Sequence, residues 1–235
     1  MTRELWVGDL GRRRYAEVLE LQRELAKERI AGTREDTLLL VEHEPVITLG
    51  RSSKAAHLLA DAGLLAARGV ELFEIERGGD VTFHGPGQLV GYPIIDLKRH
   101  TQDLHWYLRQ LEQVLIDALA TFGIAGARVE KATGVWVGPR KIASIGVHAK
   151  NWVTWHGFAL NVSTDLSYFD LIVPCGIPDV EMTSISKELT RDVPMAEVHT
   201  AVIAAFARRF ALDRCESSPS ESQTPESDLA PMRLS

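Results

Sequence analysis

The sequence predicts a single domain that mixes helices and strands, a pattern compatible with an α/β fold of the α+β type but not enough to select that class alone. Three segments, near residues 12–30, 104–122 and 198–210, carry apolar residues at helical spacing. Between residues 128 and 162 several β-rich runs follow one another across short turns, and strands joined in this way pair antiparallel. With 235 residues the chain is long enough for one large core, which we assign to residues 1–215.

The composition is that of an ordinary globular protein, with 45% apolar and 25% charged residues. Its net charge of −6 gives no general attraction to nucleic acid or to an anionic membrane, so we expect neither as a partner. The two cysteines do not require a disulfide, and no apolar run is long enough to span a bilayer. Because the N-terminus lacks the features of a signal peptide, we expect a cytoplasmic protein, and we expect a monomer.

The elements before residue 50 are predicted from their periodicity. Residues 4–8 are typical of a short edge strand, and residues 12–30 of a helix. Residues 37–41 and 46–49 are β-rich, and residues 43–45 between them predict a turn or bulge.

Residues 54–76 are predicted to form a helix followed by a strand. Residues 54–68 are rich in alanine and leucine, which indicates a helix that ends at Gly69. Residues 72–76 are typical of a strand. His43 and His57 are interpreted as exposed polar residues without a role.

The most distinctive stretch is the glycine-rich segment at residues 77–88, Arg-Gly-Gly-Asp-Val-Thr-Phe-His-Gly-Pro-Gly-Gln. Its four glycines and one proline permit tight backbone shapes and a close approach of main chain to a ligand. Arg77, Thr82, His84 and Gln88 supply hydrogen-bonding groups along it. An ordinary turn between strands is the alternative, but the density of polar and turn residues favours a binding loop. The spacing matches neither dinucleotide nor phosphate-loop fingerprints, so it does not indicate a nucleotide site.

The second half of the chain begins with the clearest helix, at residues 104–122, which Gly123 ends. The β-rich runs that follow predict an antiparallel meander. Its strands are placed at residues 128–131, 134–137, 141–150 and 152–162, with turns at 132–133, 138–139 and 151.

Asp192 and Pro194 favour the start of a final helix. This helix presents apolar residues from Val198 to Phe210. From residue 216 onward the bias toward Ser, Pro, Glu and Thr leaves too little apolar surface to fold. We therefore expect a disordered acidic tail at residues 216–235.

Cys175 is the candidate nucleophile. It lies in the sequence Pro-Cys-Gly-Ile-Pro, whose prolines and glycine hold the backbone out of a helix or a central strand. Reactive side chains are often displayed on such loops, although a lone cysteine is also a common core residue. An unperturbed thiol is only a few per cent ionised at neutral pH, roughly, so a cation or a base is needed nearby. Cys215 is treated as incidental.

Lys141 is the candidate cation. It begins a strand whose same face carries Ala143, Ile145 and Val147, so it is placed to be partly desolvated. A lysine at a strand end that reaches solvent is the alternative. A desolvated lysine loses its proton readily and can act as a base toward a cysteine. The eight histidines and two cysteines show no zinc-binding spacing, so we expect no metal.

Four ordered motifs resemble those of the lipoyl/octanoyl transferase family. They are Arg-Gly-Gly-x-x-Thr-x-His-Gly-Pro-Gly-Gln at residues 77–88, Lys-x-Ala-Ser-Ile-Gly-Val at 141–147, His-Gly-Phe-Ala-Leu-Asn at 156–161 and Pro-Cys-Gly-Ile at 174–177. The resemblance extends from about residue 5 to residue 210 and leaves out the acidic tail. Asp80 and Phe83 occupy places where the pattern tolerates several residue types.

The resemblance implies a biotin/lipoate protein ligase-like domain, with a mixed, largely antiparallel sheet flanked by helices. It implies transfer of an octanoyl group from octanoyl-acyl carrier protein to a lysine of the lipoyl domains of 2-oxo-acid dehydrogenases or of the glycine-cleavage H protein, without a cofactor. It assigns the thioester nucleophile to Cys175 and the tuning lysine to Lys141. The substrate-binding residues that it implies are Arg77, Gly78, Gly79, Asp80, Val81, Thr82, Phe83, His84, Ser144, Ile145, Gly146, Gly157, Phe158 and Ala159.

Three alternatives remain at this point. An ATP-dependent lipoate or biotin ligase shares the implied fold but activates a free acid, and a non-catalytic binding module needs no reactive Cys175. His84 is a rival to Lys141 as the base, because histidine titrates near neutrality without a special environment. We expect Lys141 to be the base, since the resemblance assigns it that role and its strand can desolvate it.

Overall fold

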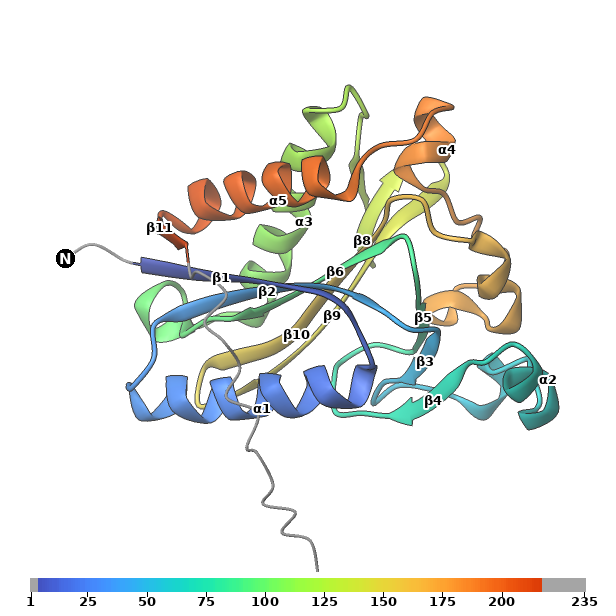
Figure 1. The fold of residues 1–235 in the computed structure, drawn as a ribbon, viewed down its shortest axis with the longest axis horizontal. Coiled ribbons are helices and arrows are strands. Elements are labelled where there is room, and N and C mark those ends of the chain that lie inside the picture. Colours follow the sequence, from blue (N-terminus) through green and yellow to red (C-terminus); the bar gives the residue numbers. More distant parts are fainter. Residues whose placement is uncertain (1–3, 217–235) are drawn as a thin grey trace, which may run out of the picture.

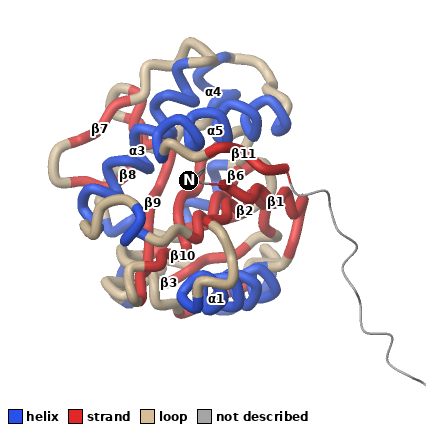
Figure 2. Tube along the Cα trace, turned by 90° about the vertical axis from the view of Figure 1, so that its left-hand side faces the viewer, coloured by secondary structure: helices blue, strands red, loops and turns tan. Residues whose placement is uncertain are grey.

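The computed structural model describes residues 4–216 and consists of two sheets and five α-helices within that range. The large sheet has eight strands in the order β11-β1-β2-β6-β10-β9-β8-β7, and the small sheet has the order β4-β3-β5. Helix α1 covers one face of the large sheet, whereas α3 and α5 cover the other (Figure 1). Figure 2 shows the same layers from the side.

The elements have the following bounds. The large sheet consists of β1 (Glu4–Arg13), β2 (Asp36–His43), β6 (Gln88–Ile94), β7 (Ala127–Val129), β8 (Ala132–Val137), β9 (Arg140–Lys150), β10 (Val153–Asn161) and β11 (Asp213–Glu216). The small sheet consists of β3 (Val46–Leu49), β4 (Glu71–Glu74) and β5 (Val81–His84). The helices are α1 (Tyr15–Ala31), α2 (Ala62–Ala67), α3 (Leu104–Ala120), α4 (Ile185–Leu189) and α5 (Met195–Phe210), with short 3-10 turns η1 (Ala55–His57), η2 (Leu97–Arg99), η3 (Leu166–Leu171) and η4 (Pro174–Gly176).

The predicted mixed, largely antiparallel sheet is confirmed. Strand β1 runs parallel to its neighbours β2 and β11, and the remaining pairs of the large sheet are antiparallel. The predicted meander corresponds to β7, β8, β9 and β10, which pair in chain order. The predicted long helices correspond to α3 and α5.

Several predicted boundaries are wrong. The first strand extends to Arg13 and is not an edge strand, because β11 pairs with its outer side, so the helix begins only at Tyr15. Residues 54–68 do not form one helix but η1 and α2. The turn between β7 and β8 lies at residues 130–131 instead of 132–133. Residue 216 belongs to β11, and the remainder of the predicted tail lies outside the described residues.

The glycine-rich segment contains a strand that its composition did not predict. Residues 81–84 form β5, which pairs antiparallel with β3. Alternation along β5 directs Val81 and Phe83 into an apolar cluster beneath the small sheet, where the Phe83 ring stacks on Tyr168 at 4.7 Å. Thr82 and His84 therefore point the other way, toward the large sheet.

Two apolar layers enclose the large sheet. The layer under α3 and α5 contains Phe158 and Leu160 of β10, and the layer under α1 contains Val153 and Ala159 of the same strand. This alternation is the period-two pattern of a strand that is buried on both faces.

A buried carboxylate on α3 holds the β7–β8 hairpin. The side chain of Glu112 is fully buried, and its oxygens accept hydrogen bonds from Arg109 at 2.7 Å, Arg128 at 2.9 Å and the Gly134 amide at 3.1 Å. A buried carboxylate is tolerated only when such donors compensate for its lost hydration. The contact therefore fixes the hairpin against α3.

We predict that Glu112→Gln lowers the free energy of unfolding by about 1–3 kcal/mol, because Arg109, Arg128 and the Gly134 amide lose the anionic acceptor that Glu112 provides in the protein interior. Urea denaturation followed by circular dichroism measures the change. Glu28→Gln is the matched control, since Glu28 pairs with Arg34 at the surface and its loss is expected to cost less than about 1 kcal/mol. Equal losses in the two variants would contradict the role given to Glu112.

Candidate active site

A cavity of about 380 Å³ lies between the glycine-rich segment, strands β6, β9 and β10, the start of β8, and the η4 turn. Its volume is near the lower end of the range of about 300–1,000 Å³ that is usual for ligand pockets. Most of the predicted site residues line it. These are Arg77, Gly79, Asp80, Thr82, His84, Lys141, Ser144, Ile145, Gly146, Gly157, Phe158, Ala159 and Cys175.

Gly78, Val81 and Phe83 do not line this cavity. The Gly78 amide donates to the carbonyl of Val147 at 2.8 Å, which joins the glycine-rich segment to β9. Val81 and Phe83 lie in the apolar cluster of the small sheet. Gly146 on β9 allows this close approach, because a β-carbon there would lie 2.8 Å from the Gly78 carbonyl oxygen.

Cys175 lies at the centre of η4 in a left-handed backbone conformation, with φ of 56°. Gly176, which follows it, has φ of 68°. The turn is closed by hydrogen bonds from the Gly176 amide to Val173 at 3.0 Å and from the Ile177 amide to Pro174 at 3.1 Å. A non-glycine residue in this conformation is strained by about 1–3 kcal/mol and persists only when its surroundings hold it.

Lys141 is fully buried, and its amine contacts the sulfur of Cys175. The Nζ–Sγ distance is 3.1 Å, and Nζ also donates to the carbonyl of Thr133 at 3.3 Å. The same amine lies 4.9 Å from the centre of the Trp136 ring, within the range of a cation–π contact. The Oγ of Ser144 lies 3.6 Å from the sulfur.

These neighbours decide the ionisation of the thiol. Packing around the sulfur raises the pKa of Cys175, whereas the charge of Lys141, the hydrogen bonds from Ser144 and Lys141, and the charge of Arg77 lower it. Together, the effects that lower the pKa outweigh the effect of burial, so the pKa of Cys175 lies below its ordinary value. The site therefore favours a thiolate beside an ammonium group.

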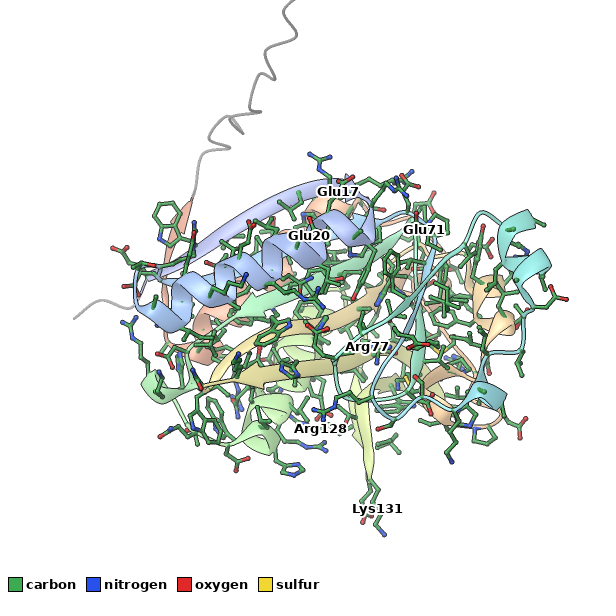
Figure 3. The ribbon with its side chains drawn as sticks, turned by 90° about the horizontal axis from the view of Figure 1, so that it is seen from below. Glu17, Glu20, Glu71, Arg77, Arg128 and Lys131 are labelled. Atoms are coloured by element: carbon green, nitrogen blue, oxygen red, sulfur yellow. The ribbon has the colours of Figure 1, made fainter. Side chains whose placement is uncertain are left out.

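Arg77 is held inside the protein. Only 7% of the residue is exposed, and its guanidinium donates to the Thr48 carbonyl at 2.7 Å and to the Gly78 carbonyl at 3.1 Å. Figure 3 shows Arg77 among the strands, whereas Lys131 projects from the tip of the β7–β8 hairpin. Arg77 therefore acts on the cavity as a fixed buried charge.

His84 is buried and uncharged near neutral pH. Burial, the neighbouring His43 and the charge of Arg77 lower the pKa of His84 to about 3, against a hydrogen bond with Gln88 that raises it. The Nδ1–Oε1 distance to Gln88 is 2.8 Å, and Gln88 in turn donates to Asn161 at 2.9 Å. An imidazole with so low a pKa is a poor base for a thiol, which favours Lys141 over His84.

The structure adds residues that the sequence did not indicate. Tyr15 of α1, with Val90 and Tyr92 of β6, lines the part of the cavity next to the α1 layer. His43, expected to be exposed, is fully buried and contacts the Tyr92 hydroxyl at 2.7 Å. His57, also expected to be exposed, is half-buried and contacts Asp80 at 2.6 Å. These contacts join residues that are far apart in the sequence, so no local sequence pattern predicts them.

Two further properties concern the part of the chain that the structure describes. Among residues 4–216, no cluster of three or more His, Cys, Asp or Glu side chains is arranged to hold a metal ion. Over the same range, no helix has the length and apolar character that crossing a membrane requires.

Comparison with solved structures identifies the fold. Lipoate-protein ligase A bound with ATP has a TM-score of 0.72 at 18% identity, over 94% of this chain and 90% of that chain. A bipartite lipoate protein ligase from Thermoplasma acidophilum has a TM-score of 0.69 at 18% identity, over 94% and 88% of the respective chains. This similarity confirms the predicted biotin/lipoate protein ligase-like fold.

Comparison of sequences identifies the family. The model of the lipoyl protein ligase A/B catalytic domain matches residues 14–207. An octanoyltransferase of Solibacter usitatus is 52% identical over 210 residues, which cover 88% of this chain and 94% of that protein. An octanoyltransferase of Rubrobacter xylanophilus is 53% identical over 194 residues, which cover 82% and 87% of the two chains. The chain therefore belongs to the lipoyl protein ligase A/B catalytic-domain family and, within it, to the octanoyltransferases, a group of acyltransferases.

Proposed function

We propose that this chain transfers an octanoyl group from octanoyl-acyl carrier protein to a lysine of a lipoyl domain, through a thioester on Cys175. The acceptors are the lipoyl domains of 2-oxo-acid dehydrogenases and the glycine-cleavage H protein. The observation that carries the proposal is the 3.1 Å contact between the buried amine of Lys141 and the Cys175 sulfur, at a cavity whose lining includes Val90, Ile145 and Phe158. A thioester donor is already activated, so the transfer needs no nucleotide.

In the first half of the reaction Lys141 holds the proton of the Cys175 thiol. The thiolate attacks the carbonyl carbon of the carrier thioester, a new carbon–sulfur bond forms, and the bond to the carrier sulfur breaks. Lys141 returns its proton to the departing carrier thiolate. Ser144 supports the charged sulfur, because its hydroxyl lies 3.6 Å away.

In the second half the neutral amine of the acceptor lysine attacks the octanoyl-enzyme thioester. An amide bond forms, the bond to Cys175 breaks, and the sulfur leaves as a thiolate beside Lys141. Lys141 accepts the proton released by the amine. The enzyme returns to its starting protonation state once Lys141 and Cys175 again share one proton.

The acyl chain is proposed to lie across the strands. Ser144 of β9 pairs with Ala159 of β10, and Ala159 pairs with Val90 of β6, so these residues form one row that begins beside the sulfur. Two strand spacings cover about 10 Å, which suits an extended eight-carbon chain. Burying about seven carbons at ~0.8 kcal/mol each contributes roughly 5 kcal/mol of binding.

An ATP-dependent ligase is the second candidate, since the fold is shared with a ligase that binds ATP. That activity joins a free acid to AMP and has no use for a paired cysteine. The identity of about half the residues with octanoyltransferases favours acyl transfer.

We predict that mixing the protein with octanoyl-acyl carrier protein gives a hydroxylamine-labile octanoyl adduct on Cys175, detected by intact-mass spectrometry. Cys175→Ser should give no labile adduct, because an oxygen ester resists hydroxylamine better than a thioester. Octanoate with ATP should give neither an adduct nor acceptor labelling. Labelling of a lipoyl domain from octanoate and ATP, but not from the carrier, would establish the ligase instead.

We predict that Lys141→Ala moves the pH profile of Cys175 alkylation to higher pH, since the charge and hydrogen bond of Lys141 lower the thiol pKa. Loss of a positioned base should also reduce kcat/KM by about 10²–10⁴-fold. Iodoacetamide rates across pH measure the first effect.

His84→Ala is the control for this experiment, because His84 is neutral over the range where the thiol titrates. The alkylation profile should stay in place in this variant. A profile that shifts in His84→Ala and not in Lys141→Ala would show that the base is assigned wrongly.

We predict that Val90→Phe shortens the accepted acyl chain, because Val90 lies at the far end of the proposed row. The ratio of octanoyl to butanoyl transfer should fall by about 10-fold or more, the discrimination that one or two methylenes give in a tight pocket. Rates with butanoyl, hexanoyl and octanoyl carriers, measured within the variant, separate this effect from lost stability. An unchanged ratio would place the chain elsewhere.

A further inference from the structure

A histidine–aspartate contact lies directly against the turn that carries Cys175. The Nδ1 of His57 lies 2.6 Å from Oδ2 of Asp80, and the two side chains are 19% and 10% exposed. His57 follows β3 in the sequence, whereas Asp80 belongs to the glycine-rich segment. Neither residue is part of η4. Two segments from outside the turn therefore meet beside Cys175.

The contact reaches η4 in two ways. The backbone carbonyl of His57 accepts a hydrogen bond from the Val173 amide at 2.8 Å, just before the turn. At Gly176, directly after Cys175, a β-carbon would lie 2.5 Å from Oδ2 of Asp80 and 3.1 Å from Cε1 of His57. The paired side chains therefore pack on the turn so closely that only glycine fits at this position.

Asp80 is itself fixed by its own strand. Its second oxygen, Oδ1, accepts a hydrogen bond from the Val81 amide at 2.7 Å, at the start of β5. With one oxygen bound to the strand and the other to His57, the carboxylate has one orientation. The position of Gly176, and through it of Cys175, is set by the small sheet.

This support matters because the turn is strained. Cys175 has φ of 56°, a conformation that costs a non-glycine residue about 1–3 kcal/mol unless its surroundings hold it. If the turn relaxes, the sulfur leaves the place where it lies 3.1 Å from the Lys141 amine. A displacement of about 1 Å at a reacting atom is enough to reduce a rate by about 10²-fold.

We propose that His57 and Asp80 are positioning residues for Cys175: their contact holds the left-handed turn and so keeps the sulfur beside Lys141. The role rests on the proposed function for its effect on acyl transfer. Its effect on the reactivity of the thiol does not depend on any substrate. The charged or polar groups that face the sulfur are Lys141, Ser144 and Arg77, with Asp80 beside the turn.

The test compares His57→Ala with His57→Asn in the full chain. Alanine removes the donor to Asp80, whereas the asparagine amide nitrogen takes nearly the place of Nδ1 and restores it. We expect His57→Ala to move the alkylation profile of Cys175 to higher pH and to slow formation of the octanoyl-enzyme by roughly 10- to 100-fold. His57→Asn should restore most of both properties.

His199→Ala is the matched control. His199 on α5 contacts Asp9 on β1 at 3.0 Å, away from the cavity, and its side chain is 14% exposed, close to the 19% of His57, although Asp9 is more exposed than Asp80. It should change neither property. Asp80→Ala should likewise slow formation of the octanoyl-enzyme, and the double variant His57→Ala/Asp80→Ala should form it no more slowly than the slower single variant, since both substitutions remove one contact.

Two results would overturn the proposal. One is an alkylation profile and a rate of octanoyl-enzyme formation that are both unchanged in His57→Ala. The other is a His57→Asn variant as impaired as His57→Ala, which would show that the imidazole ring itself is needed. Failure of the wild-type protein to form an octanoyl adduct, with the alkylation shift still present, would instead contradict the proposed function and leave the positioning role supported.

Discussion

A buried lysine amine is stable only beside groups that accept its hydrogen bonds and compensate its charge, and the candidate active site is arranged around this requirement. Lys141 has no exposed surface. Its amine contacts the Thr133 carbonyl, the Trp136 ring and the Cys175 sulfur. A sulfur that carries negative charge is the only one of the three that balances the charge of the amine, so burial of Lys141 and ionisation of Cys175 support each other.

The rest of the fold supplies these partners from three parts of the chain. The β7–β8 hairpin brings Thr133 and Trp136, and the buried carboxylate of Glu112 holds that hairpin against α3. The small sheet brings the glycine-rich segment, whose Gly78 amide joins it to β9. The η4 turn brings the sulfur. Strained backbone at Cys175 is thus placed between rigid elements, which hold its geometry.

The sequence predicted the parts of this arrangement that depend on local periodicity or on motif resemblance. The helices α3 and α5 and the meander carry long, regular apolar patterns, and the motifs placed Lys141 and Cys175 in one cavity. The sequence does not predict strand β5, because its alternation of apolar and polar residues is only four residues long and glycines flank it on both sides. The buried state of His43 and the contact between His57 and Asp80 were missed because a polar residue type predicts exposure, and only tertiary packing supplies the partner that reverses it.

The central claim is that the buried amine of Lys141 keeps the Cys175 sulfur as a thiolate. The most direct measurement is the ultraviolet absorbance of the thiolate as a function of pH in the unliganded protein, with Cys175→Ser as the reference. We predict a thiolate signal from Cys175 whose midpoint lies below the ordinary thiol value of about 8.5. A midpoint at or above that value, or a signal that is the same in Cys175→Ser, would contradict the claim.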